Sequence, residues 1–127
     1  MSESNVSIGS IELYVNDIEK SKLFYEAIGI NLEKSYYSDW PTDVKAFEYV
    51  ASFKDRESLF SLNYAQKNVV TNDKLWFYVD NVAEVIAKLL AIGASILRPR
   101  SRAYRFATLA YVKDPDGRTI CLKQRGT

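Results

Sequence analysis

Two segments of the chain alternate apolar and polar residues, and each is followed by a helix-like pattern that ends at a glycine. The end of the first alternating segment and the helix pattern after it read YVNDIEKSKLFYEAIG at 14–29. The corresponding part of the second copy reads YVDNVAEVIAKLLAIG at 78–93, so that 64 positions separate the two copies. Strict alternation predicts a strand with one buried face. Apolar residues three and four positions apart predict an amphipathic helix. The chain therefore repeats one strand–helix unit.

The two copies share the same predicted helix boundaries. Asn16 and Glu19 have the spacing of a capping box, which satisfies free backbone amides at a helix start, and Asn81 and Glu84 repeat that spacing. The final glycine of each stretch predicts a left-handed helix end. The apolar positions of the second helix are Val82, Val85, Ile86, Leu89 and Leu90.

Three further strands are predicted after each helix. The sequence KDPDGRT, with Pro115 and Gly117, predicts a tight turn between the last two strands. The KDRES sequence occupies the corresponding place in the first half. The predicted strands cover 31–37, 44–53 and 58–65 in the first half, and 95–99, 107–113 and 119–124 in the second.

A single βαβββ unit leaves one face of its sheet uncovered, because its one helix covers only the other face. A tandem copy can supply the missing cover. We therefore expect an α+β fold in a single domain at 1–127, with two tandem βαβββ modules whose curved mixed sheets enclose a cavity. An accidental match between two unrelated strand–helix units is the alternative. The expected parts are module one at about 8–65, a linker at 66–73 and module two at about 74–124.

The composition is that of a globular domain and disfavours several classes of function. The chain has 127 residues, 47% of them hydrophobic, and a formal net charge of +1, so neither a nucleic acid nor a membrane is expected as a partner. No apolar run approaches the ~18 residues of a membrane helix. The polar N-terminus lacks the features of a signal peptide, so a cytoplasmic location is expected. Without histidine and with one cysteine, no Ser-His-Asp or Cys-His arrangement can form.

The motifs of both copies resemble a known family. The order strand, Asp, helix, FY and Gly in the first copy, together with DPDG before the last strand, is similar to the glyoxalase/bleomycin resistance/extradiol dioxygenase superfamily, also called vicinal oxygen chelate proteins. The resemblance covers about Ile8 to Gln124. It implies paired βαβββ modules, usually in a homodimer, with a cavity lined by the sheets. In many members the modules pair across the two chains.

Enzymes of this superfamily hold a divalent metal with His, Gln or Glu on the first and last strands of each module. By this resemblance the four positions are Ser10, Ser61, Lys74 and Cys121, and the chain departs from the pattern at all of them. An ammonium beside the ion would repel it. We therefore expect no metal, no cofactor and no catalytic residues. The resemblance is closest to the bleomycin resistance branch, whose small metal-free dimers bind a drug in the cavity and sequester it.

The residues expected to contact a ligand lie on the helix-free sides of the predicted strands or in two loops. Plain packing in a core or an interface is the alternative for the aromatic ones. Aromatic residues in KSYYSDWPTD (34–43) would stack on flat ligand rings. The predicted ligand-binding residues are Glu12, Tyr14, Tyr37, Trp40, Asn63, Lys74, Trp76, Tyr78, Arg102 and Cys121.

Two charged features have competing interpretations. Glu12 and Lys74 are expected to form an internal ion pair, and proton transfer by Glu12 is the alternative. The basic loop Arg98–Arg105 is either a solvated loop or a rim that binds anions. A basic loop fits cationic bleomycin-type drugs poorly, so the ligand can differ from that drug.

Three hypotheses for the function follow. The first is non-catalytic binding and sequestration of a small aromatic or antibiotic molecule by a homodimer. The second is a lyase, isomerase or dioxygenase of the same superfamily that uses other positions, with Glu12 and Glu48 as the residues to suspect. The third is an accessory domain that contacts a protein through the Tyr/Trp loop.

Overall fold

The structure is a computed structural model and describes residues 3–36, 47–55, 57–65, 67–103 and 107–126. The order of its elements confirms two tandem βαβββ modules. In chain order the elements are β1 (Ser10–Val15), α1 (Ile18–Ile28), β2 (Glu33–Tyr36), β3 (Phe47–Ser52), β4 (Leu59–Tyr64), β5 (Lys74–Val79), α2 (Val82–Ala91), β6 (Ser95–Ala103), β7 (Ala107–Lys113) and β8 (Thr119–Gln124).

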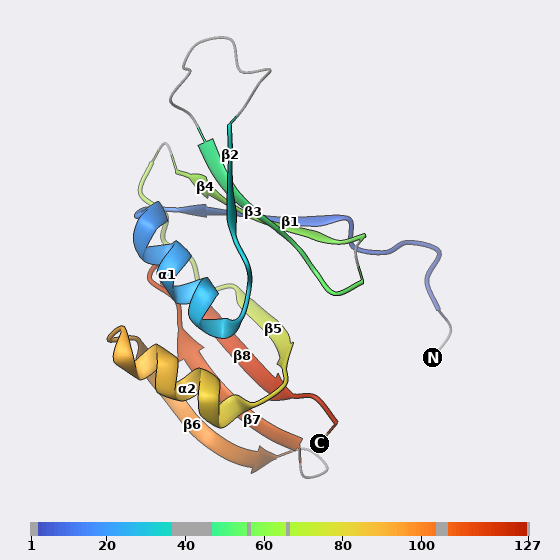
Figure 1. Ribbon diagram of the computed structural model, residues 1–127, viewed down its shortest axis with the longest axis vertical. Coiled ribbons are helices and arrows are strands. Elements are labelled where there is room, and N and C mark those ends of the chain that lie inside the picture. Colours follow the sequence, from blue (N-terminus) through green and yellow to red (C-terminus); the bar gives the residue numbers. More distant parts are fainter. Residues whose placement is uncertain (1–2, 37–46, 56, 66, 104–106, 127) are drawn as a thin grey trace.

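Each module forms one four-stranded mixed sheet, and the two sheets have the same topology. The strand orders are β1-β4-β3-β2 and β5-β8-β7-β6. In both sheets the first strand pairs in parallel with the last, and the other pairs are antiparallel. The two helices contact one another along one side of the molecule (Figure 1). Each sheet therefore has one face towards the helices and one helix-free face.

The helix boundaries follow local capping chemistry, with one correction. Asn81 caps α2, as predicted, because its side chain accepts a hydrogen bond from the Glu84 amide. The cap of α1 is Asp17 rather than Asn16, and Asp17 Oδ1 accepts from the Lys20 amide at 3.0 Å. The Asn16 side chain is instead bonded to the linker, where it accepts from the backbone N–H of Val69 and donates to its carbonyl. Neither helix in the described part of the chain has the length and apolar character needed to cross a membrane.

One hydrophobic core is shared by the two modules. Tyr25 of α1 and Phe60 of β4 are fully buried, and both rings contact Phe77 of β5, with centroids 6.4 and 6.2 Å apart. Phe53, just after β3, also contacts Phe77. Because the aromatic rings of module one pack on a strand of module two, burial of apolar surface holds the modules together.

The strands match the prediction within a few residues, except for β6. The prediction placed β6 at 95–99, whereas it extends to Ala103 and includes Pro99. Two register shifts, between Ile96 and Arg98 and between Arg98 and Ser101, interrupt its pairing with β7. A proline lacks the N–H for a ladder hydrogen bond and is accommodated at an edge or a bulge. The edge position and the bulges together explain why the strand continues through Pro99.

Candidate functional site

The helix-free face of module two carries aromatic and basic side chains that were predicted to bind a ligand. Lys74, Trp76 and Tyr78 of β5 lie on this face, and Trp76 and Tyr78 are 50% and 64% exposed. The strand register places Cys121 of β8 between Trp76 and Tyr111 of β7. The alternation of the strand therefore leaves two large rings at the surface of the sheet.

Contacts between neighbouring side chains order this face. The rings of Trp76 and Tyr111 meet edge to face, with centroids 5.9 Å apart. Lys74 Nζ lies 5.6 Å from the centroid of Tyr111, and Lys123 Nζ lies 5.6 Å from that of Tyr78. A shallow pocket of about 200 Å³ is lined by Trp76, Phe77, Tyr78 and Lys123. Flat rings beside ammonium groups suit a flat molecule that carries an anionic or polar group.

Cys121 forms the floor of this face and is fully buried. Burial raises the pKa of its thiol, although the nearby ammonium of Lys74 acts in the opposite direction. The side chain is therefore a neutral thiol near pH 7 and behaves as a small apolar group. The thiol fills space beneath the aromatic face and, being neutral and buried, is a poor nucleophile.

The helix-free face of module one is more acidic. Glu12 and Tyr14 of β1 are exposed, whereas Asn63 of β4 is buried and donates a hydrogen bond to the buried Ser61 hydroxyl at 3.0 Å. Glu48 lies opposite Asn63 in the sheet and so shares this face. The helix-free face is therefore acidic in module one and basic in module two.

The four positions that hold a metal in the superfamily's enzymes do not fit a metal ion in this chain. They carry two hydroxyls, from Ser10 and Ser61, the Lys74 ammonium and the buried Cys121 thiol. The Ser61 hydroxyl already accepts a hydrogen bond, and the ammonium would repel a cation. Among the described residues, no group of three or more His, Cys, Asp or Glu side chains is placed to hold a metal.

The other predicted site residues have mixed outcomes. Tyr37 and Trp40 lie outside the described residues, and so does the side chain of Arg102 on β6. The expected ion pair between Glu12, on β1, and Lys74, on β5, is not among the ion pairs that join described residues. Glu12, Tyr14, Asn63, Lys74, Trp76, Tyr78 and Cys121 all lie on the two helix-free faces.

Both helix-free faces are open in the single chain. Tyr14 is 52% exposed on module one, and Trp76 and Tyr78 are at least half exposed on module two. An enclosed cavity between the sheets therefore requires a second surface that covers these side chains. The enclosed cavity is therefore a prediction about a dimer and not a property of the single chain.

A buried polar junction joins the modules and was not predicted from the sequence. The Tyr25 hydroxyl of α1 donates a 2.6 Å hydrogen bond to Asp114 Oδ2 in the turn before β8. Arg118 donates to the same oxygen at 3.1 Å and to the backbone carbonyl of Tyr14 at 2.9 Å. Burial and the Asp114 carboxylate raise the pKa of Tyr25 far above its ordinary value. The FY and DPDG motifs were the available signal, since the junction joins one to the other.

The comparisons with known proteins identify the family. The family model of the Glyoxalase/Bleomycin resistance protein/Dioxygenase superfamily matches residues 7–122. The chain belongs to this superfamily. No curated protein matches the sequence.

Solved structures of the superfamily share the fold. TnmS3, an antibiotic binding protein from Streptomyces sp. CB03234, is 23% identical, with a TM-score of 0.63 over 96% of this chain and 98% of that one. A superfamily member from Sphaerobacter thermophilus DSM 20745 is 17% identical, with a TM-score of 0.66 over 94% and 98%. A glyoxalase I mutant from Zea mays is 19% identical, with a TM-score of 0.72 over 94% of this chain and 46% of that one. At these identities the likeness shows the fold alone.

Proposed function

We propose that this superfamily member binds and sequesters a small aromatic or antibiotic-like molecule without altering it. The observation that carries the proposal is the open aromatic face of module two, where Trp76 and Tyr78 are 50% and 64% exposed beside Lys74 and Lys123. Large exposed rings grouped on one face are typical of binding surfaces. The poor donor set at the superfamily's metal positions favours binding over metal-dependent catalysis. The description of TnmS3 as an antibiotic binding protein agrees with this class of ligand.

The proposed binding mode uses stacking for affinity and cations for orientation. The edge-to-face contact with Tyr111 fixes the Trp76 indole, so little side-chain entropy is lost when a flat ligand stacks on it. Lys74 and Lys123 would pair with an anionic or polar substituent of the ligand. The neutral thiol of Cys121 would form the floor.

A homodimer would close the ligand site. The helix-free face of module one carries Glu12 and Glu48, whereas that of module two carries Lys74 and Lys123. In a two-fold dimer each acidic face can oppose the basic face of the other copy, so the contact forms twice. Light scattering coupled to size exclusion measures this: a dimer mass that falls to the monomer mass in Lys74→Glu supports the arrangement, and a wild-type monomer rejects it.

A thermal-shift panel on metal-stripped protein tests the function. The panel contains aromatic antibiotics, including bleomycin-type drugs, together with aromatic acids and divalent metals. A ligand at 100 times its Kd adds about 2.7 kcal/mol to the free energy of unfolding and raises Tm visibly. A shift with an aromatic ligand and none with metals is the expected result. A shift with metals alone would contradict the proposal.

The Trp76→Ala variant locates the binding surface. If stacking carries affinity, this variant should weaken binding by about 1–3 kcal/mol. Tyr36→Ala is the matched control, because Tyr36 is 62% exposed but lies on the helix side of the other sheet. Equal affinity of Trp76→Ala and wild type in a calorimetric titration would exclude the stacking model.

The second candidate is a lyase, isomerase or dioxygenase of the same superfamily. The observation that favours it is that Glu12 and Glu48 share the helix-free face of module one with Asn63. Stoichiometric divalent metal in the native protein, bound less tightly in Glu12→Gln, would support this candidate over sequestration.

A further inference from the structure

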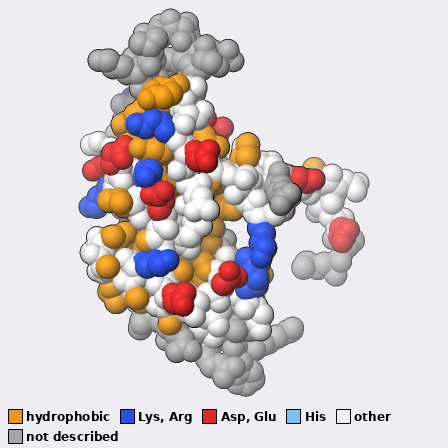
Figure 2. Space-filling model, in the orientation of Figure 1, with side chains coloured by type: hydrophobic (Ala, Val, Ile, Leu, Met, Phe, Trp, Pro, Cys, Tyr) orange, Lys and Arg blue, Asp and Glu red, His pale blue; other side chains and the backbone are white. Residues whose placement is uncertain are grey.

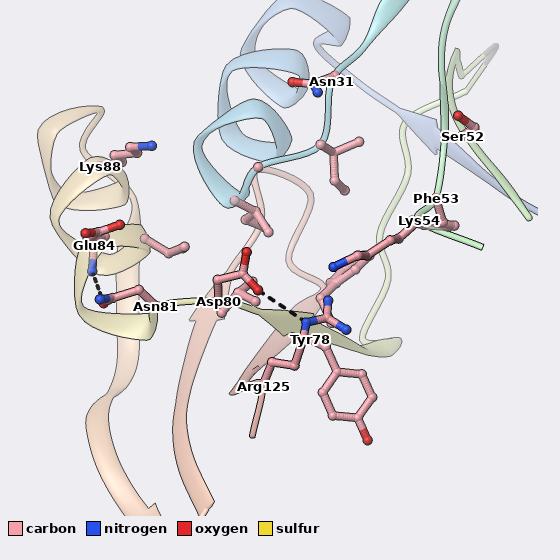
Figure 3. Close-up of a pocket in the computed structure, with 16 residues that line it drawn as sticks. Asn31, Ser52, Phe53, Lys54, Tyr78, Asp80, Asn81, Glu84, Lys88 and Arg125 are labelled. Carbon is pink, nitrogen blue, oxygen red and sulfur yellow. Dashed lines mark hydrogen bonds and ion pairs between the residues drawn. The ribbon is translucent and has the colours of Figure 1, made fainter. Parts of the chain in front are cut away.

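An open cleft lies between the two modules and was not predicted from the sequence. Its volume is about 480 Å³, within the range of small-molecule pockets. The walls come from the ends of α1, β3 and β5 and from the first turns of α2 (Figure 3). Its apolar lining is Ile28, Ile30, Phe53, Phe77, Val79 and Val85.

The internal repeat creates this cleft twice, and the second copy is smaller. The equivalent pocket at the other module junction, below the end of α2, has a volume of about 220 Å³. There Tyr25 is bonded to Asp114, the first residue of the turn between β7 and β8. In the open cleft the repeat places Leu89 at the position of Tyr25 and Phe53 at the position of Asp114, since the backbone N–H of each closes its own hairpin. Two apolar side chains thus replace the hydroxyl–carboxylate bridge, and of these Phe53 lines the open cleft.

The charges around the open cleft favour an anion. Lys54 follows β3, Arg125 follows β8, and both side chains point towards the centre of the cleft from different elements (Figure 3). Arg125 Nε donates to Asp80 Oδ1 at 3.2 Å, but these side chains are 49% and 87% exposed, so water weakens the pair. Lys88 and Glu84 of α2 complete the charged lining, which has three cations and two carboxylates. The amino end of α2 adds a partial positive charge.

We propose that the intermodule cleft is a second small-molecule site that takes an amphipathic anion, a molecule with a flat apolar body and one carboxylate or sulfonate. The body packs on Phe53 and Phe77, and the anionic group lies between Lys54 and Arg125. Arg125 exchanges its exposed partner Asp80 for the ligand. Phe77 and Tyr78 line both this cleft and the shallow pocket of the sheet face. Trp76 lines only the sheet-face pocket and Lys54 only the cleft, so changes at these two residues distinguish the sites.

Fluorescence titration with anilinonaphthalenesulfonate tests the proposal, and phenylnaphthylamine serves as the matched probe that lacks the sulfonate. The sulfonate probe should bind wild type more tightly than the neutral one. Lys54→Ala should raise its Kd about tenfold, the effect of losing one charged contact. Lys67→Ala, which removes an exposed lysine of the linker, is the control and should leave Kd unchanged. Urea midpoints verify that each variant is folded.

Trp76→Ala separates the cleft from the sheet face. The proposal predicts that this variant keeps the Lys54-dependent binding of the sulfonate probe. Loss of binding in Trp76→Ala with no change in Lys54→Ala would place the probe on the sheet face and overturn the proposal. Equal affinity for the charged and neutral probes would overturn it as well. Either result leaves the antibiotic panel on the sheet face as an independent test.

Discussion

Replacing Tyr25 by Phe should measure the strength of the polar junction between the modules. The change removes the hydroxyl that donates to Asp114 Oδ2 at 2.6 Å and keeps the ring, which is fully buried among other aromatic side chains. Asp114 still accepts from the amides of Asp116 and Arg118 and from the Arg118 guanidinium. A hydrogen bond to a charged group contributes about 1.5–3 kcal/mol, and the three remaining donors reduce the loss. We expect a loss of about 2 kcal/mol.

Urea unfolding followed by tryptophan fluorescence is the assay. The midpoint should fall while the slope of the free energy against urea concentration stays constant, because no cavity forms and the exposed area on unfolding is unchanged. Tyr36→Phe is the control, since Tyr36 is 62% exposed, and surface changes cost less than about 0.5 kcal/mol. If Tyr25→Phe were as stable as this control, the bond would have no role in joining the modules.

Three further changes test the junction and the helix start. Burial and Asp114 raise the pKa of Tyr25 above its ordinary value of 10.0. The contribution of the Tyr25 hydroxyl to the free energy of unfolding is therefore complete below about pH 10 and declines as the pH rises further. Above that pH the urea midpoint of wild type should converge on that of Tyr25→Phe. Arg118→Met leaves two buried carboxylates without their guanidinium and should lower the free energy of unfolding by about 3–5 kcal/mol; a calorimetric loss below 1 kcal/mol would refute this reading. Asp17→Ala removes the cap of α1 and should cost about 1 kcal/mol in urea, whereas an equal stability would mean that Asp17 is not the cap.

Most of the fold could be predicted because its signals are local. The alternation in β1 and β5, the Asn81 cap and the turn at Gly117 depend on residues within a few positions of one another. The wrong cap at Asn16 shows the limit of such signals. Two neighbouring side chains could both cap α1, and the choice was made by distant partners, Val69 and Asp116, which bind the Asn16 side chain.

The candidate site was predictable only in part. Strand alternation placed Trp76 and Tyr78 on the correct face, because a period of two follows from the backbone itself. It could not show how the two sheets are placed relative to one another, because that depends on packing across the whole chain, and the ion pair expected between Glu12 and Lys74 is absent from the described residues. The intermodule cleft was missed for the same reason. Its lining comes from parts of α1, β3, β5 and α2 and from Arg125 after β8, and no local pattern shows that these parts are neighbours.

The DPDG turn of the second half supplies hydrogen-bond partners to the first half. Asp114 and Arg118 of the second half complete the hydrogen bonding of Tyr25 and of the Tyr14 carbonyl in the first. Phe77 likewise completes the aromatic core of the first half. Neither half is then a finished domain, and each carries the complementary part of a single core. A break in the linker at 66–73 would yield two fragments suited to reassembly, so this junction is a natural place to split the protein into a complementation pair.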